Sequence, residues 1–296
     1  MHDHSNCDHH KPASYNTAFA VGVGLNVTFV VVEIVYGIAT RSLSLLADAG
    51  HNVGDVLGLL MGWAAAYLAT RPPTAKRTYG YRRSSILAAL ANSSLLLLAV
   101  GAIAWEAIQR LSEPVPVPGQ VVMAVAAIGI FINGGTALMF VRGRKDDLNI
   151  EGAYLHMLTD AIVAAGVVVA GYAMRITHYA WIDPISSLVI VFLITMGSWR
   201  LLRRSFDLAI DAVPDGVDSL AVRSYLQSQP GVVAVSDLHI WGMSTTETAL
   251  TAHLVMPEGS ANDFVSNLAH ELIHEFGISH STIQVDREPG SCSLAV

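Results

Sequence analysis

Residues 45–70 read LLADAGHNVGDVLGLLMGWAAAYLAT, an apolar run that is long enough for a helix to cross a lipid bilayer. Five further stretches are similarly apolar, and each has the roughly 20 residues that one crossing needs. They cover residues 17–40, 84–109, 120–141, 152–174 and 182–202. The sequence therefore predicts an α-helical membrane protein with six transmembrane helices.

The composition also favours a membrane protein. Apolar residues make up 52% of the 296 residues and charged residues only 14%, against roughly a quarter in soluble domains. The mean hydropathy is +0.47. The net charge of −7 includes only 17 lysines and arginines, which argues against a nucleic-acid partner. The two cysteines, Cys7 and Cys292, stand near opposite ends and offer no disulfide framework.

Lysine and arginine are shared unevenly between the two sides of the predicted membrane domain. Most of them lie before the first span or after the second, fourth and sixth spans. The connections on the opposite side carry only Arg41, Arg110 and Arg175. Because positive residues are retained in the cytoplasm, we expect a multi-pass protein of the inner or plasma membrane with both termini cytoplasmic.

Four parts follow along the chain. We expect a His-rich cytoplasmic tail over residues 1–14, the transmembrane domain over 15–205, a soluble cytoplasmic domain over 206–290 and a short tail over 291–296. Hydrophobic patterning in the soluble domain predicts helices over 217–228 and 261–276 and strands over 232–241, 247–256 and 279–286. This αββαβ order predicts a two-layer α/β domain whose helices cover one face of the sheet. The other face would be free for a partner, such as a second copy of the chain.

Two predicted spans carry the same pair of ionisable residues. His51 and Asp55 lie in the second span and His156 and Asp160 in the fifth, both spaced as His-x-x-x-Asp. Residues four apart share a helix face, and ionisable groups inside a membrane are costly enough to require a function. Two such pairs facing each other would supply two imidazole nitrogens and two carboxylate oxygens, a tetrahedral set suited to zinc. Two carboxylates also balance the charge of a divalent ion.

Further motifs surround these pairs: Ser42-Leu-Ser-Leu-Leu-Ala-Asp48-Ala-Gly-His51, Arg77-Thr-Tyr-Gly-Tyr-Arg-Arg83, Trp181-Ile-Asp183-Pro184 and His280-Ser-Thr-Ile-Gln-Val-Asp286. With them, the chain resembles the cation diffusion facilitator family from about residue 15 onward, in particular its zinc-transporting members. The resemblance implies a homodimeric membrane exporter that exchanges a divalent metal ion for protons. It also implies that residues 206–290 form a ferredoxin-like dimerisation and regulatory domain, similar to metallochaperones.

The resemblance also implies a metal site in the cytoplasmic domain. His239, His253 and Asp286 fall near positions that bind regulatory zinc in similar family members. Gln284 departs from the pattern, because some relatives have a ligand histidine at that position.

Other histidines leave alternatives open. His270 and His274 share a face of the second predicted cytoplasmic helix and His280 follows, so they offer other ligand sets. Residues 2–10 hold four histidines, and such a tract can collect metal or serve no essential role.

Several polar residues in the spans have more than one interpretation. Asn26 and Glu33 lie seven apart on one face of the first helix. They act as a relay, as support for the metal ligands or as interhelical hydrogen bonds. Asp48 either caps the second helix or guides ions. Asp183 precedes Pro184, and this order predicts that Asp183 caps its own helix.

We therefore expect a secondary active transporter and not an enzyme. It would bring Zn²⁺ out of the cytoplasm by alternating access at His51, Asp55, His156 and Asp160, with Co²⁺, Cd²⁺ and Ni²⁺ as open alternatives. Proton exchange follows because metal ligands must be deprotonated. A nucleotide is not expected, since the sequence has no G-x-x-x-x-G-K-[ST] loop.

Two alternatives remain at this point. One is a membrane metal sensor that signals without transport. The other is an intramembrane metallohydrolase, which needs an open zinc position and a general base. The six spans carry no H-E-x-x-H motif, and a closed four-ligand site favours carrying the ion over activating water.

Overall fold

The computed structural model describes residues 16–141, 148–260 and 263–288. The predicted tail over 1–14, the end of the chain over 291–296 and both cysteines lie outside these ranges. The chain divides into two compact units. One contains the residues up to 56 together with 98–195, and the other contains 57–97 together with the residues from 196 onward.

Six long helices correspond to the six predicted spans: α1 (Asn16–Thr40), α2 (Leu43–Ala69), α3 (Ser84–Ser112), α4 (Gly119–Phe140), α5 (Leu148–Thr177) and α6 (Ile182–Ala209). Within the described residues, five of them are long and apolar enough to cross a membrane, and α1 contributes the shorter apolar segment Gly24–Thr40. Large apolar side chains such as Trp63, Leu98 and Phe131 remain exposed on these helices, as a surface in contact with lipid requires. The predicted fold class is confirmed.

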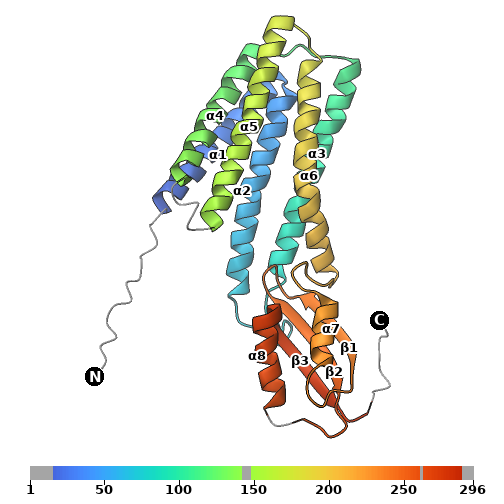
Figure 1. Cartoon of the computed structure of the whole chain (residues 1–296). Helices are drawn as coiled ribbons and strands as arrows, with labels where there is room; N and C mark the ends of the chain where they lie inside the picture. The colour runs from blue at the N-terminus through green and yellow to red at the C-terminus, as the bar shows by residue number, and fades with distance from the viewer. Residues whose placement is uncertain (1–15, 142–147, 261–262, 289–296) are drawn as a thin grey trace, which may run out of the picture. The chain divides into compact units, whose positions relative to one another are not determined.

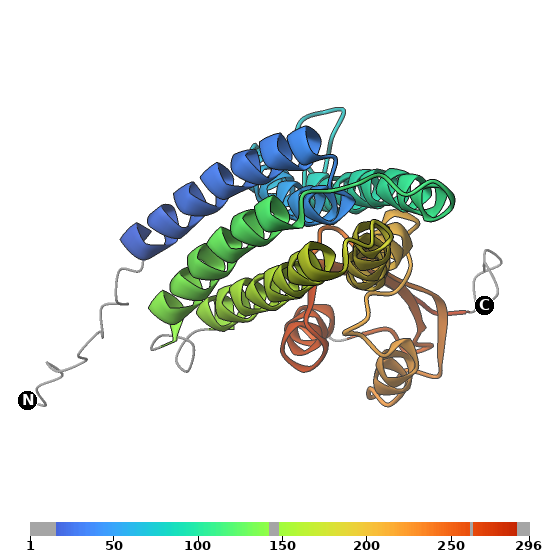
Figure 2. The ribbon, with the colours of Figure 1, turned by 90° about the horizontal axis from the view of Figure 1, so that it is seen from above.

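Within the first unit, α4 lies between α1 and α5 (Figures 1 and 2). Glycines allow α4 to approach both neighbouring helices closely. A Cβ atom on Gly119 would lie 2.5 Å from the carbonyl oxygen of Gly171, and one on Gly129 would lie 2.5 Å from the Phe29 ring. Small residues let membrane helices pack backbone to backbone. This packing holds α5, which carries one of the two His-Asp pairs.

The beginning of α2 is capped by a carboxylate from α6. Asp183 is completely buried and accepts hydrogen bonds from the backbone N–H groups of Leu43 (2.7 Å) and Ser44 (3.3 Å). The hydroxyl groups of Ser42 and Ser44 also donate to Asp183, each at 2.7 Å. A helix N-terminus has unpaired N–H groups and attracts negative charge. The prediction that Asp183 caps its own helix is therefore wrong, because its carboxylate serves α2 instead.

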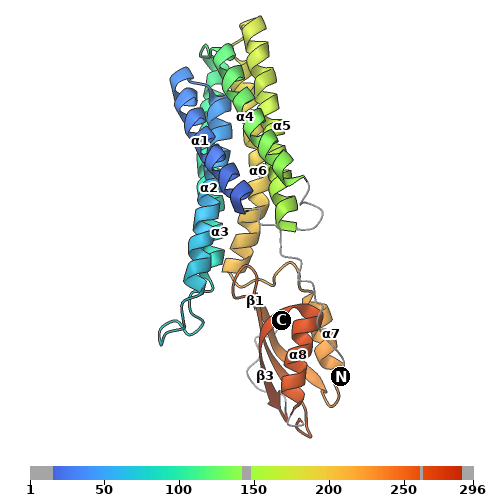
Figure 3. The same cartoon turned by 90° about the vertical axis from the view of Figure 1, so that its left-hand side faces the viewer.

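The second unit contains the soluble α/β domain in the predicted order: α7 (Ser219–Gln227), β1 (Ala234–Gly242), β2 (Thr248–Val255), α8 (Phe264–Phe276) and β3 (Ile278–Asp286). The sheet order is β1-β2-β3, with β1 antiparallel and β3 parallel to β2. Figure 3 shows both helices beside this sheet.

One hydrophobic core joins α7 and α8 to the same face of the sheet. Leu250 and Leu254 of β2 pack with Leu226 of α7 and Leu272 of α8. Side chains alternate along a strand, so His253 lies on the opposite face. As predicted, the helices cover one face of the sheet.

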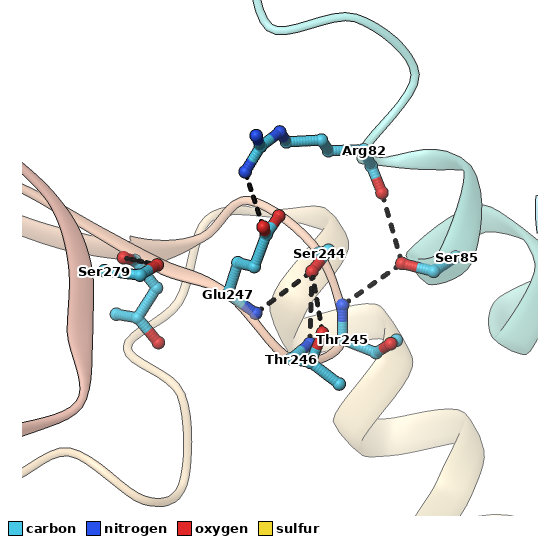
Figure 4. A network of polar contacts seen from close by, with 8 residues as sticks. Arg82, Ser85, Ser244, Thr245, Thr246, Glu247 and Ser279 are labelled. Atoms are coloured by element: carbon cyan, nitrogen blue, oxygen red, sulfur yellow. Dashed lines mark hydrogen bonds and ion pairs between the residues drawn. The ribbon is translucent and has the colours of Figure 1, made fainter. Parts of the chain in front are cut away.

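The turn between β1 and β2 contacts the beginning of α3 within the second unit (Figure 4). Arg82 donates to Glu247 at 2.5 Å. The backbone N–H of Thr245 donates to the hydroxyl group of Ser85 at 3.1 Å. Ser244 holds the turn itself, because its hydroxyl accepts from the backbone N–H of Glu247 at 3.0 Å.

Candidate metal site

The two His-Asp pairs predicted from the sequence meet within the first unit. His51 Nε2 of α2 lies 3.6 Å from Asp55 on its own helix and 3.6 Å from Asp160 on α5. His156 Nε2 of α5 lies 3.4 Å from Asp55 and 3.6 Å from Asp160. The centres of the two imidazole rings are 6.1 Å apart. Each histidine therefore contacts the aspartate of both helices.

These separations match the edges of a metal tetrahedron. Zinc binds imidazole nitrogen and carboxylate oxygen at about 2.0–2.2 Å, so two donors at tetrahedral corners are about 3.3–3.6 Å apart. The four nitrogen–oxygen distances lie between 3.4 and 3.6 Å. His51, His156 and Asp160 each offer a donor atom within 4.8 Å of those of the other two. Asp55 is not part of that group of three, and its Oδ2 lies 3.6 Å from His51 Nε2 and 3.4 Å from His156 Nε2.

The donors are largely withdrawn from solvent and lack other partners. Asp160 is only 2% exposed, and the other three side chains are between 23% and 39% exposed. Asp55 Oδ2 and both carboxylate oxygens of Asp160 are buried without a hydrogen bond to any described residue. Buried polar atoms are normally paired, and a bound cation would pair these.

The helix α5 begins earlier than the sequence predicts. We expected this span to begin at residue 152, but α5 begins at Leu148. At 1.5 Å per residue, the extra turn moves His156 and Asp160 about 6 Å further from the helix end.

Polar groups of α1 support the neighbouring helices. Asn52, next to His51 on α2, donates to the completely buried carboxylate of Glu33 at 3.1 Å. Asn26 donates to the sulfur atom of Met157 on α5 at 3.6 Å. Both contacts are interhelical hydrogen bonds, and each involves a residue adjacent in sequence to a histidine of the site. Asp48 is buried inside α2, beyond its first turn, and does not cap it.

The three predicted ligands of the cytoplasmic domain also lie close together, and a fourth residue, Asp237, contacts both histidines. His253 Nδ1 lies 3.1 Å from Asp286, and its Nε2 lies 3.7 Å from Asp237. His239 Nε2 lies 3.0 Å from the other oxygen of Asp237. Gln284 donates to Asp286 at 2.8 Å. The glutamine therefore orients a carboxylate where some family members have a histidine.

Asp237 was missed because its position depends on an irregularity of the strand. The register of β1 against β2 shifts between Ser236 and His239, and Asp237 has a φ of 49°. Such a bulge redirects side chains. A regular strand would place Asp237 and His239 on the same face by alternation, but it gives no reason for a bond between them. A single sequence carries no clear signal for this turn of the backbone.

Comparisons with known proteins agree with this picture. The cation efflux transmembrane domain matches residues 19–208, and the cation efflux protein cytoplasmic domain matches residues 214–288. The metal cation efflux system protein CzcD of Cupriavidus metallidurans is 34% identical over 95% of this chain and 90% of its own length.

Two further relatives have names that specify ions. The zinc transporter ZitB of Escherichia coli is 32% identical over 97% of this chain and 93% of its own length. The cadmium, cobalt and zinc/H(+)-K(+) antiporter of Bacillus subtilis is 30% identical over 88% of this chain and 85% of its own length.

Proposed function

The chain belongs to the cation efflux family, and we propose that it carries Zn²⁺ out of the cytoplasm in exchange for protons. Efflux of divalent metal ions by a multi-pass membrane protein follows from the family. The chain is accordingly a transporter and not an enzyme. The identity of the ion, the counter-ion and the ligands constitutes our proposal.

The observation that carries the proposal is the meeting of His51, Asp55, His156 and Asp160 at tetrahedral spacing. Two nitrogens and two oxygens suit Zn²⁺, and Co²⁺, Cd²⁺ and Ni²⁺ can occupy similar sites. The names of the relatives include zinc, cobalt and cadmium. Two aspartates and one divalent ion sum to zero charge, which lowers the cost of holding the ion away from water.

Proton exchange follows from the chemistry of the ligands. A metal ion binds neutral imidazole and ionised carboxylate, so binding releases protons and protonation releases the ion. A site exposed first to the cytoplasm and then to the other side would load metal on one side and protons on the other. The proton gradient would then drive metal export.

The cytoplasmic domain adds two proposals of its own. The cluster of His239, His253, Asp237 and Asp286 is proposed to bind a regulatory metal ion, since His253 lies between two carboxylates. The same sheet face is free of the domain's own helices, which supports a homodimer formed by this domain. We propose both termini to be cytoplasmic from the distribution of positive residues.

The test is zinc uptake into proteoliposomes with an imposed pH gradient. We expect gradient-dependent uptake in the unaltered protein and none after His51→Ala or Asp160→Ala. His178→Asn is a matched control, because His178 is exposed after α5 and its φ of 57° suits asparagine. This variant should transport normally.

The outcomes separate the alternatives. Uptake of cobalt or cadmium but not zinc would keep the mechanism and change the ion. Zinc uptake that ignores the pH gradient would refute proton coupling. Binding of metal without flux of any divalent ion would favour the metal sensor.

A further inference from the structure

A second pair of histidines lies on the exposed surface of α8. His270 and His274 are four residues apart near the end of this helix, and both are exposed. Their ring centres are 4.4 Å apart, with the ring planes inclined at 45°. The sequence between them reads His-Glu-Leu-Ile-His, so the H-E-x-x-H motif that the six spans lack occurs in the soluble domain.

Hydrolytic chemistry is not supported at this position. A catalytic zinc of the H-E-x-x-H type needs a third protein ligand and a carboxylate that is free to act as base. Glu271 instead accepts a hydrogen bond of 2.7 Å from the hydroxyl group of Tyr225 on α7. Among the described His, Cys, Asp and Glu residues, none offers a third donor atom that converges with those of His270 and His274.

The pair can nevertheless chelate a metal ion. Side chains at positions i and i+4 share a helix face, and two imidazoles on one face can turn their nitrogens towards a common ion. The ion would gain from its place near the C-terminus of α8, because a helix carries partial negative charge there. Gly277 ends the helix three residues after His274. The carboxylate of the exposed Glu275 adds negative charge beside the pair.

We propose that His270 and His274 form a solvent-exposed metal site on the cytoplasmic domain. It binds one ion of the Zn²⁺, Co²⁺, Ni²⁺ or Cu²⁺ class through two imidazole nitrogens, and water fills the remaining positions. Because solvent reaches the ion directly, it exchanges more readily than an ion enclosed by four ligands. The site is separate from the cluster around His253 and independent of the transport mechanism.

Equilibrium dialysis of the full-length protein in detergent against radioactive zinc near neutral pH tests this site. H270N/H274N should bind about one zinc equivalent per chain fewer than the unaltered protein, because asparagine does not replace imidazole as a ligand. Each single variant should lose the same equivalent, since one imidazole cannot chelate. Ions held by the other sites are common to all variants and cancel in the difference.

Two controls make the result specific to the paired geometry. H274N/E275H keeps two histidines but separates them by about 140° around the helix, so it should lose the same equivalent. H280N removes an exposed histidine that packs against Tyr79 and should bind as much zinc as the unaltered protein. Far-ultraviolet circular dichroism checks that each variant is folded.

The proposal is overturned if H270N/H274N binds zinc with unchanged stoichiometry and affinity. It is also overturned if H274N/E275H retains the equivalent, because any exposed histidine would then suffice. This test measures zinc binding and not zinc flux. Its result can therefore be interpreted even if the transport proposal fails.

Discussion

Replacing Asp183 should destabilise the protein by removing the cap of α2. In Asp183→Ala, the backbone N–H groups of Leu43 and Ser44 lose their buried acceptor. A buried donor left unpaired costs about 1–3 kcal/mol, so the two together cost about 2–6 kcal/mol. The serine hydroxyl groups add less, because Ser42 and Ser44 lie 3.0 Å apart and can pair with each other.

The effect should reach the metal site, because the capped end of α2 precedes His51 by about two turns. Unfolding in a denaturing detergent, followed by circular dichroism, measures the loss of stability. Zinc titration of the same samples measures the loss of affinity. Asp183→Asn keeps one acceptor oxygen and should lose about half as much stability. Ser186→Ala is the control, because its hydroxyl only donates to the backbone oxygen of Asp183.

The reasoning is refuted if Asp183→Ala unfolds within about 0.5 kcal/mol of the unaltered protein, the range typical of surface changes. A loss as large in Ser186→Ala would also refute it, since the carboxylate would then not be the cause.

Three other perturbations have defined outcomes. Gly171→Ala should lower the unfolding temperature, because its Cβ would lie 2.9 Å from the carbonyl oxygen of Gly119, and overpacking costs about 1–3 kcal/mol; an unchanged temperature would contradict the close packing of α4 and α5. Arg82→Gln should change the free energy of unfolding by less than about 1 kcal/mol, because the ion pair between Arg82 and Glu247 is solvent-exposed. A larger change, measured by chemical unfolding, would contradict this prediction. The hydrogen bond to Glu271 raises the pKa of Tyr225 above its ordinary value of 10.0; the stability it contributes is therefore complete below that pH and lost as the pH rises through the folded-state pKa. Tyr225→Phe should remove this alkaline loss from the pH profile of unfolding, and an identical profile would argue against the bond.

Much of the fold was predictable because it depends on local patterns. The length of each apolar run predicts a spanning helix, and five of the six helices begin within two residues of the expected position. The αββαβ order follows from hydrophobic alternation and helical periodicity in the same way. His51 with Asp55, and His156 with Asp160, were recognised because spacing alone places each pair on one helix face.

The partnerships between distant residues were not predictable. Asp183 precedes a proline and has the local signature of a cap for its own helix, yet its carboxylate lies at the start of α2. Asp237 enters the cytoplasmic cluster through a bulge, and no residue pattern in β1 signals it. The H-E-x-x-H motif of α8 is a local pattern that suggests a hydrolytic zinc site. The tertiary structure argues against that function, because Tyr225 on α7 donates a hydrogen bond to the glutamate of the motif, Glu271.

The sequence by itself determined that this chain crosses a membrane and carries two His-Asp pairs on two helices, because helix length and i, i+4 spacing are local properties. Only the tertiary structure decided that both histidines contact both aspartates at 3.4–3.6 Å. Those distances depend on how α2 and α5 are placed relative to each other, which is a property of the packed helices and not of either local sequence.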